Sequence, residues 1–253
     1  MSGHNKWSKI KRQKGLEDAK KGAIYTKLTR EIIMAAREGS GDLESNFKLR
    51  LAVQKARDSS MPKDNIERAI ERGVGGNEGA ILEELLFEGY GPSGTAILVK
   101  TLSDNRNRTV QEVKNIFTRQ GGTMGASGSV AWMFDTKGII SVDGEGLDPD
   151  EVTLQAIDAG ADDVKVDDGS IEIYTKPTEL EIVKKGLEAK KINIANAELS
   201  MIPKNLVEVE DKAAIQTLKL LERMEELDDV QKTYSNVDFS DKVLEKFDSG
   251  DYE

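Results

Sequence analysis

The sequence predicts an α+β fold, made of an N-terminal three-helix bundle and two α/β (ferredoxin-like) domains, the last inserted into the middle one. Two observations predict this class. Roughly the first 75 residues show only helical spacing of apolar side chains, whereas later segments alternate between strand and helix patterns. The predicted elements of residues 138–202 follow the order β-α-β-β-α-β, which is the split βαβ arrangement.

Three short helices are expected in the N-terminal domain, residues 1–78. The first covers 23–38 and stops at Gly39, and the third covers 61–72, with Pro62 in its first turn. In the second, apolar residues recur at i, i+3, i+4 and i+7, and these are Leu49, Ala52, Val53 and Ala56. Such stripes pack helices into a small bundle. The glycine-rich segment 73–79 is the expected linker to the next domain.

The middle domain is predicted to begin at residue 79. Its elements are expected to be strands at 82–90 and 95–102, a helix over 104–122, and a strand at 128–134. Thr109 and Glu112 have the spacing of a capping box, and Gly121 and Gly122 are expected to end the helix.

The inserted domain is predicted to cover residues 136–205. Its elements are a strand at 138–142, a helix at 148–160, a hairpin at 164–168 and 170–175, a helix at 177–191, and a strand at 197–202. A helix at 211–227 and a strand at 230–239 then remain without a partner, so we expect them to return to the middle domain. That domain therefore comprises 79–135 and 206–240. Residues 241–253 are expected to be a frayed acidic tail.

The composition excludes several classes of protein. Cysteine is absent, which rules out disulfides, thiolate catalysis and cysteine–zinc sites, and suits a reducing cytosol. The longest aliphatic run, residues 96–99, is far too short to span a membrane. No apolar segment follows the basic start, so a secretory signal is not expected. We therefore expect a cytoplasmic protein that does not contact a membrane.

Residues for catalysis or metal binding are also lacking. His4 is the single histidine, so neither a Cys–His pair nor a multi-histidine metal site can form. The acidic pairs at 162–163 and 167–168 flank a predicted hairpin and favour solvated turns. The glycine-rich segment 89–94 lacks the end of a phosphate-binding loop and is expected to be a tight turn. We expect no enzyme activity, cofactor, metal or small-molecule substrate.

The charge of the chain is segregated. The formal net charge is −10, but residues 1–30 carry nine Lys and Arg against two acids, a net charge of +7, whereas residues 73–253 carry −17. Such asymmetry indicates a polyanionic partner at one end. Lysines and arginines there would contact phosphates, and the aromatic side chains would stack on unpaired bases. The candidate nucleic-acid-binding residues are His4, Lys6, Trp7, Lys9, Lys11, Arg12, Lys14, Lys20, Lys21, Lys27 and Arg30.

A second candidate contact lies where a predicted strand meets a predicted helix. Arg106 and Arg108 stand among asparagines at this helix N-terminus, where guanidinium groups and free backbone N–H groups could bind phosphate. Alternatively, the two arginines pair with nearby acids. The spacing of the basic residues matches neither a helix-turn-helix motif nor a zinc finger, so base-sequence specificity is not predicted.

Several long segments resemble the YebC/PmpR family. They include GHNKWSKIKRQK near the start, LRLAVQKARDSSMPKDNIERAIERG, EGYGPSGTAILVKTLSDNRNRTVQEV and SGSVAWMFDTKG. The resemblance extends from Gly3 to about Phe239. It implies three domains around a central cleft and a non-enzymatic regulator of gene expression. Because the family motif begins at Gly3, no mitochondrial presequence is expected.

The resemblance leaves two targets open. Bacterial members are described as transcriptional regulators that bind DNA, whereas related members act in translation, on ribosomes, easing stalls at proline-rich stretches. The residues slightly favour ribosomal RNA, because the basic arm has no recognition helix and the remaining domains are acidic. A ligand-binding protein that uses the cleft is a third possibility, although no catalytic or metal-binding set supports it. No oligomeric state is predicted.

Overall fold

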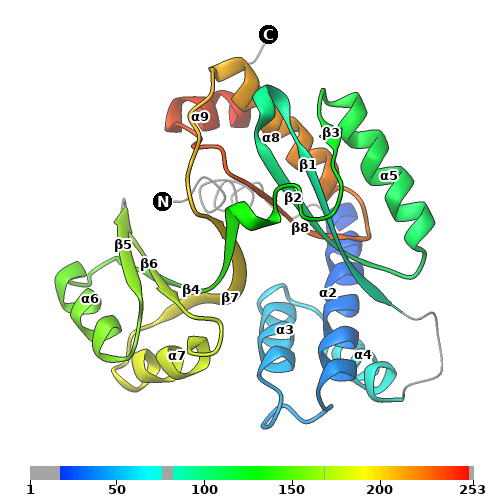
Figure 1. The fold of residues 1–253 in the computed structure, drawn as a ribbon. Helices are drawn as coiled ribbons and strands as arrows, with labels where there is room; N and C mark the ends of the chain where they lie inside the picture. Colours follow the sequence, from blue (N-terminus) through cyan, green and yellow to red (C-terminus); the bar gives the residue numbers. More distant parts are fainter. Residues whose placement is uncertain (1–17, 76–81, 168, 251–253) are drawn as a thin grey trace.

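The computed structural model describes residues 18–75, 82–167 and 169–250 (Figure 1). In this part of the chain, helices α2 (Asp18–Glu38), α3 (Phe47–Asp58) and α4 (Lys63–Val74) pack together at the N-terminal end. The Asn46 side chain accepts a hydrogen bond from the Leu49 amide and so caps α3. The common core of the three helices contains the predicted apolar stripes, including Leu28, Ile32, Leu49, Ala52, Val53 and Ala56.

The first sheet has the strand order β3-β1-β2-β8 and is antiparallel throughout. Its strands are β1 (Glu83–Tyr90), β2 (Ala96–Ser103), β3 (Thr123–Met124) and β8 (Val230–Ser235). Helices α5 (Arg106–Arg119), α8 (Asp211–Glu225) and α9 (Asp241–Ser249) share one buried core with this sheet. Because β8 pairs with β2, the chain returns to the first sheet after the second sheet is complete.

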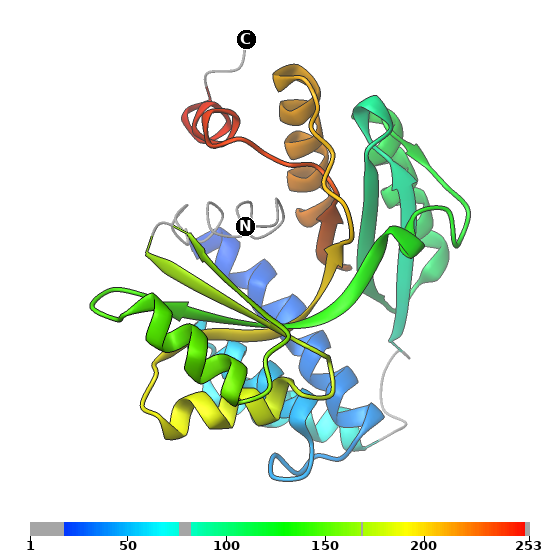
Figure 2. The same ribbon diagram turned by 60° about the vertical axis from the view of Figure 1, so that its left-hand side comes forward.

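The second sheet has the strand order β5-β6-β4-β7 and is also antiparallel. It consists of β4 (Phe134–Asp143), β5 (Asp163–Asp167), β6 (Ser170–Thr175) and β7 (Ile194–Pro203). Helices α6 (Pro149–Asp158) and α7 (Leu180–Ala189) lie on the same side of this sheet and bury a separate core (Figure 2). The two sheets and the helices give the predicted α+β class.

The capping box predicted at Thr109 and Glu112 is wrong. Helix α5 begins at Arg106, before Thr109. Its N-cap residue is Asn105, whose side chain accepts a hydrogen bond from the Arg108 amide. The Thr109 hydroxyl instead donates to a buried carboxylate 120 residues away in the sequence. A local spacing rule could not anticipate this tertiary contact.

The strand predicted at 128–134 is also wrong, except for its last residue. Residues Ala131–Met133 form a 3-10 turn, and β4 starts at Phe134. The buried Glu88 carboxylate explains the difference, because it accepts hydrogen bonds from the amides of Gly128, Val130 and Ala131 at 2.6–2.8 Å. These amides therefore cannot donate hydrogen bonds to a neighbouring strand. The turn leaves Trp132 64% exposed.

The predicted frayed tail is a helix. Ser240 caps α9 by accepting from the Val243 amide, and Val243, Leu244 and Phe247 are buried in the core of the first sheet. The tight turn expected after β1 is present as a 3-10 turn, Pro92–Gly94. A smaller difference is that β8 ends at Ser235 rather than at 239.

Candidate nucleic-acid interface

Most of the predicted arm lies outside the described residues. This applies to His4, Lys6, Trp7, Lys9, Lys11, Arg12 and Lys14. Lys20 and Lys21 lie in the first turn of α2, and the Lys21 side chain is exposed. These two lysines are therefore at the end of the helix that directly follows the arm.

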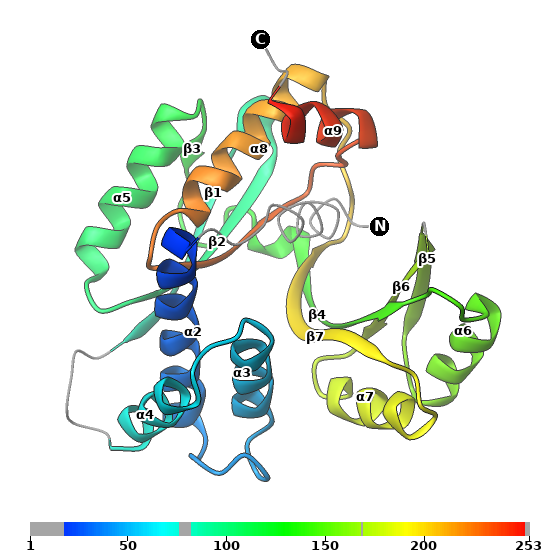
Figure 3. The same ribbon diagram turned by 180° about the vertical axis from the view of Figure 1, so that it is seen from behind.

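Two predicted contact residues hold the protein together instead. The Lys27 ammonium donates a hydrogen bond to the Glu225 carbonyl, and the Arg30 guanidinium donates to the Asp228 carbonyl. The Glu225 carbonyl lies at the C-terminal end of α8, which the start of α2 approaches (Figure 3), and the Asp228 carbonyl lies in the turn that follows. Cations are favourable at this end of a helix. Lys27 and Arg30 thus join the bundle to the first sheet's domain.

Asp229 is the centre of this junction. Its carboxylate is 3% exposed and lies 2.8 Å from the Arg30 guanidinium and 2.7 Å from the Arg108 guanidinium. It also accepts hydrogen bonds from the hydroxyls of Ser103 (2.9 Å) and Thr109 (2.6 Å). Burial raises the pKa of Asp229, but the hydrogen bonds from Arg108, Thr109 and Ser103 lower it more, so the pKa lies below its usual value.

The structure pairs both arginines of the strand–helix junction with acids. Hydrogen bonding to Asp229 and Asp104 raises the pKa of Arg108 above its usual value. Arg106 is exposed and lies 3.1 Å from Glu83. Of the two alternatives that the sequence left open, pairing within the protein is the one observed. Arg108 is part of a structural network, whereas Arg106 forms only an exposed pair.

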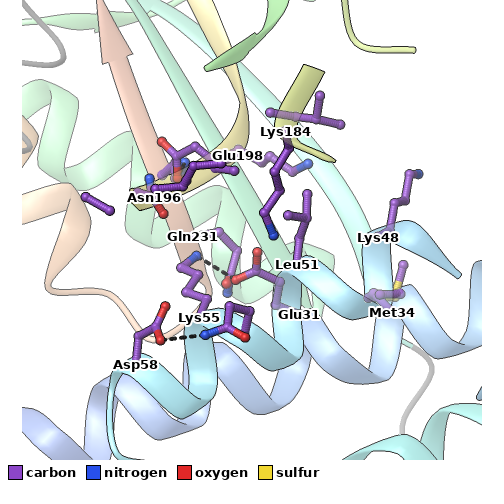
Figure 4. A pocket seen from close by; sticks show the side chains of 18 of the residues that line it. Glu31, Met34, Lys48, Leu51, Lys55, Asp58, Lys184, Asn196, Glu198 and Gln231 are labelled. Atoms are coloured by element: carbon purple, nitrogen blue, oxygen red, sulfur yellow. Dashed lines mark hydrogen bonds and ion pairs between the residues drawn. The ribbon is translucent and has the colours of Figure 1, made fainter. Parts of the chain in front are cut away.

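A groove of about 740 Å³ lies between α2, α3, α7, β7 and the first sheet, where the three parts of the molecule meet (Figure 4). Lysines line it, and each of five pairs with an acid that lines the same groove. The pairs are Lys48–Glu38, Lys55–Glu31, Lys100–Glu84, Lys184–Glu188 and Lys232–Glu198, at 2.6–3.6 Å. Such a neutralised surface offers little attraction to a polyanion.

The electrostatics of the groove follow from these pairs. Burial raises the pKa of Glu31, but the charge and hydrogen bond of Lys55 and the charge of Lys232 bring it below its usual value. Glu31 is therefore ionised at neutral pH and does not resemble a poised general acid. Within the described residues, no cluster of three or more His, Cys, Asp or Glu side chains could hold a metal ion.

A second pocket, of about 400 Å³, lies between α2 and α4. Three arginines line it, Arg30, Arg37 and Arg72, against one acid, Asp104. The sequence analysis selected only Arg30. Arg37 and Arg72 each lie in the last turn of a helix, where cations are common, so their local sequence gave no distinguishing signal.

No helix in the described part of the chain has the length and apolar content that a bilayer-spanning segment requires.

Comparisons with known proteins cover nearly the whole chain. Residues 5–76 match the model of the TACO1/YebC protein N-terminal domain, and residues 82–237 match that of the TACO1/YebC second and third domain. A protein of Dehalococcoides mccartyi named as a probable transcriptional regulatory protein is 52% identical over 249 residues, which are 98% of this chain and 99% of the relative. A protein of Herpetosiphon aurantiacus with the same name is 51% identical over 248 residues, 98% of each chain.

A solved structure supports the same assignment. The crystal structure of a conserved hypothetical protein from Aquifex aeolicus superposes with a TM-score of 0.83 at 42% identity, covering 90% of this chain and 94% of that chain. Sequence identity, coverage and fold agree, and the chain belongs to the TACO1/YebC family.

Proposed function

We propose that this protein is a cytoplasmic, non-enzymatic regulator of transcription that binds DNA through residues 3–30. The observation that carries the proposal is the charge segregation, +7 in residues 1–30 against −17 in residues 73–253. The names of the full-length relatives as probable transcriptional regulatory proteins support it. So does the pairing of the groove lysines, which leaves the N-terminal end as the part with the strongest excess of cations.

The proposed contacts are mainly electrostatic. Lysines of the arm and of the first turn of α2 would neutralise phosphates and release their counterions. Lys27, Arg30 and Arg108 bind within the protein, so we place the contacts at His4, Lys6, Trp7, Lys9, Lys11, Arg12, Lys14, Lys20 and Lys21, with the exposed Arg106 as a further candidate. Sequence preference would come from DNA shape and deformability.

A second candidate function is supported by the acidity of the rest of the chain. A body with a net charge of −17 over residues 73–253 is repelled by a long duplex but not by the basic proteins of a ribosome. In that case the arm binds ribosomal RNA, where His4 and Trp7 contact unpaired bases, and the protein relieves stalls at proline-rich sequences.

Replacement of four arm lysines tests the role of the arm. The variant Lys6→Ala/Lys9→Ala/Lys11→Ala/Lys14→Ala should lose most of its affinity for duplex DNA, measured by fluorescence anisotropy. With about five phosphates engaged, the wild-type log–log salt slope should be roughly −4 to −5 and should become much shallower in the variant. A control with four lysines of the body replaced, Lys63, Lys165, Lys212 and Lys242, should retain the wild-type slope. Equal binding by both variants would refute the proposal.

Sedimentation of a cell extract separates the two targets. A transcriptional regulator should remain in the free fraction at moderate salt and retain DNA binding. Co-migration with ribosomes, lost in the arm variant but not in the control, would instead favour the ribosomal target.

A further inference from the structure

We infer that the pocket between α2 and α4 binds a backbone phosphate of the nucleic acid, with Arg37 and Arg72 as its ligands. The inference rests on the proposed function and names a second contact beyond the arm. Its basis is an uncompensated positive charge in a formed pocket, since three arginines line the 400 Å³ space with a single acid.

The two arginines differ from the other cations of the site in having no partner within the described residues. Arg30 is occupied by Asp229, and the acid of the pocket, Asp104, is occupied by Arg108. By contrast, the Nε of Arg37 is buried and lacks a hydrogen-bond partner in the described part of the chain. A guanidinium group has five N–H donors and no acceptor, so arginines without an internal partner favour an anionic ligand.

The packing of the helices holds the backbone positions of Arg37 and Arg72 together at the pocket. Gly73 lets α4 approach α2 so closely that a Cβ atom there would lie 2.6 Å from the Ala36 Cβ and 2.7 Å from the Ile33 carbonyl. The Tyr25 hydroxyl donates to the Ser60 carbonyl at 2.7 Å and fixes the other end of the pair. The last turns of both helices therefore stay together.

A purely structural role for these arginines explains less. Cations in the last turn of a helix complement its free carbonyls, and Arg57 occupies that position in α3. However, Arg57 lines neither of the two pockets described above. Compensation of helix carbonyls does not require two such arginines to line the same pocket, as Arg37 and Arg72 do.

The position of the pocket on α2 favours a nucleic-acid phosphate over other anions. A guanidinium fork fits carboxylates and phosphates alike, so chemistry alone does not choose between them. The cationic arm, however, leads directly into α2, and Lys21 and Arg37 are about 24 Å apart along its axis, at 1.5 Å per residue. About seven base-pair steps of one duplex cover that span. The pocket therefore lies within reach of a duplex that is bound near the start of α2.

The test compares the full-length protein with three double variants by anisotropy on a fluorescent duplex between 50 and 200 mM salt. Arg37→Gln/Arg72→Gln should make the log–log salt slope shallower by about 0.9, because the pocket holds one phosphate and each lost phosphate contact contributes about 0.9. Arg37→Lys/Arg72→Lys should preserve the slope while losing the fork geometry. The control Arg119→Gln/Lys204→Gln removes the same charge far from the pocket and should match the wild type.

Three results would overturn the inference. A glutamine variant with the slope and affinity of the control shows that the pocket does not contact DNA; if the arm variant loses binding in the same assay, the proposed function still stands. If the wild-type protein does not bind the duplex, both this inference and the proposed function are refuted. The third result comes from calorimetric titration with pyrophosphate. If the wild type binds pyrophosphate and the glutamine variant does not, while the salt slope of the variant on DNA is unchanged, the pocket binds a free phosphate compound. Thermal unfolding of each variant verifies that its fold is intact.

Discussion

Arg30 on α2 and Asp229 in the turn before β8 form an ion pair with an Nη1–Oδ1 distance of 2.8 Å, although they are far apart in the sequence. The pair connects the N-terminal bundle to the first sheet. Asp229→Ala would remove the buried acceptor that two guanidinium groups and two hydroxyls share. We expect a loss of about 3 kcal/mol in the free energy of unfolding, the lower end for a broken buried pair because Arg108 is partly exposed. Urea denaturation measures it.

The neighbouring residue provides the control for this substitution. Asp228 is exposed, and only its backbone carbonyl contacts Arg30, so Asp228→Ala should change the free energy of unfolding by less than about 0.5 kcal/mol. Similar losses in both variants would show that the buried carboxylate does not hold the domains together.

The same carboxylate gives the protein a pH-dependent stability. Because the folded-state pKa of Asp229 lies below its ordinary value of 3.8, its contribution is fully present above about pH 4 and is lost as the pH falls through the folded-state pKa. The difference in urea midpoint between the wild type and Asp229→Asn should therefore be constant from pH 7 to 5 and shrink below pH 4. A difference that grows with acidification would contradict this assignment.

Glu88 should determine the conformation of the turn that presents Trp132. Glu88→Gln replaces one acceptor oxygen by an NH₂ donor, which faces amides of the turn and cannot accept from them. We expect a destabilisation of about 1.5–3 kcal/mol, the range for hydrogen bonds to a charged group. In a Trp7→Phe background, the emission of Trp132 should shift while the protein is still folded. The exposed Glu84 provides the control, as Glu84→Gln should leave that emission unchanged.

Two glycines in the bundle should respond to alanine with opposite signs. Gly73→Ala places a methyl group against the α2 backbone and should destabilise the protein by about 1–3 kcal/mol. Gly22→Ala meets no atom within 4 Å on α2 and should stabilise the protein by roughly 0.5–1 kcal/mol through helix propensity. Thermal melting of the two variants compares them directly. A stabilising Gly73→Ala would mean that the helices can separate freely.

Phe247 should contribute strongly to stability although it lies near the C-terminus. It is buried in the core of the first sheet, so Phe247→Ala should cost about 3–5 kcal/mol. The exposed Glu245, in the same helix, provides the control, as Glu245→Ala should have little effect in the same denaturation experiment. A small loss at Phe247 would support the frayed tail that the sequence indicated.

The bundle and the second sheet were predictable because their patterns are local. Leu49, Ala52, Val53 and Ala56 are all buried, as their helical spacing indicates. The errors occurred where a distant polar group decides the local structure. The apolar residues around Trp132 resemble a strand, but Glu88 binds their amides from another strand. Helix α9 was missed for a different reason, since its acidic composition obscured apolar residues at helical spacing.

The candidate site was less accessible to sequence reasoning than the fold. A cation count identifies the N-terminal end but cannot separate a side chain that faces solvent from one that faces a buried acid. Arg30 and Arg37 lie on the same helix, and only tertiary structure shows that Asp229 neutralises one and not the other. The partner residue is about 200 positions away, beyond any local pattern.

The pairing of β2 with β8 has a consequence for synthesis of the chain. Strand β2 is complete at Ser103, but β8 emerges only at Ser235, after the whole second sheet has been made. At translation rates of 5–20 residues per second, β2 keeps one unpaired edge for roughly ten seconds. During that interval the second sheet can close on the ribosome while the first remains open to wrong partners. Folding order in this protein therefore differs from sequence order.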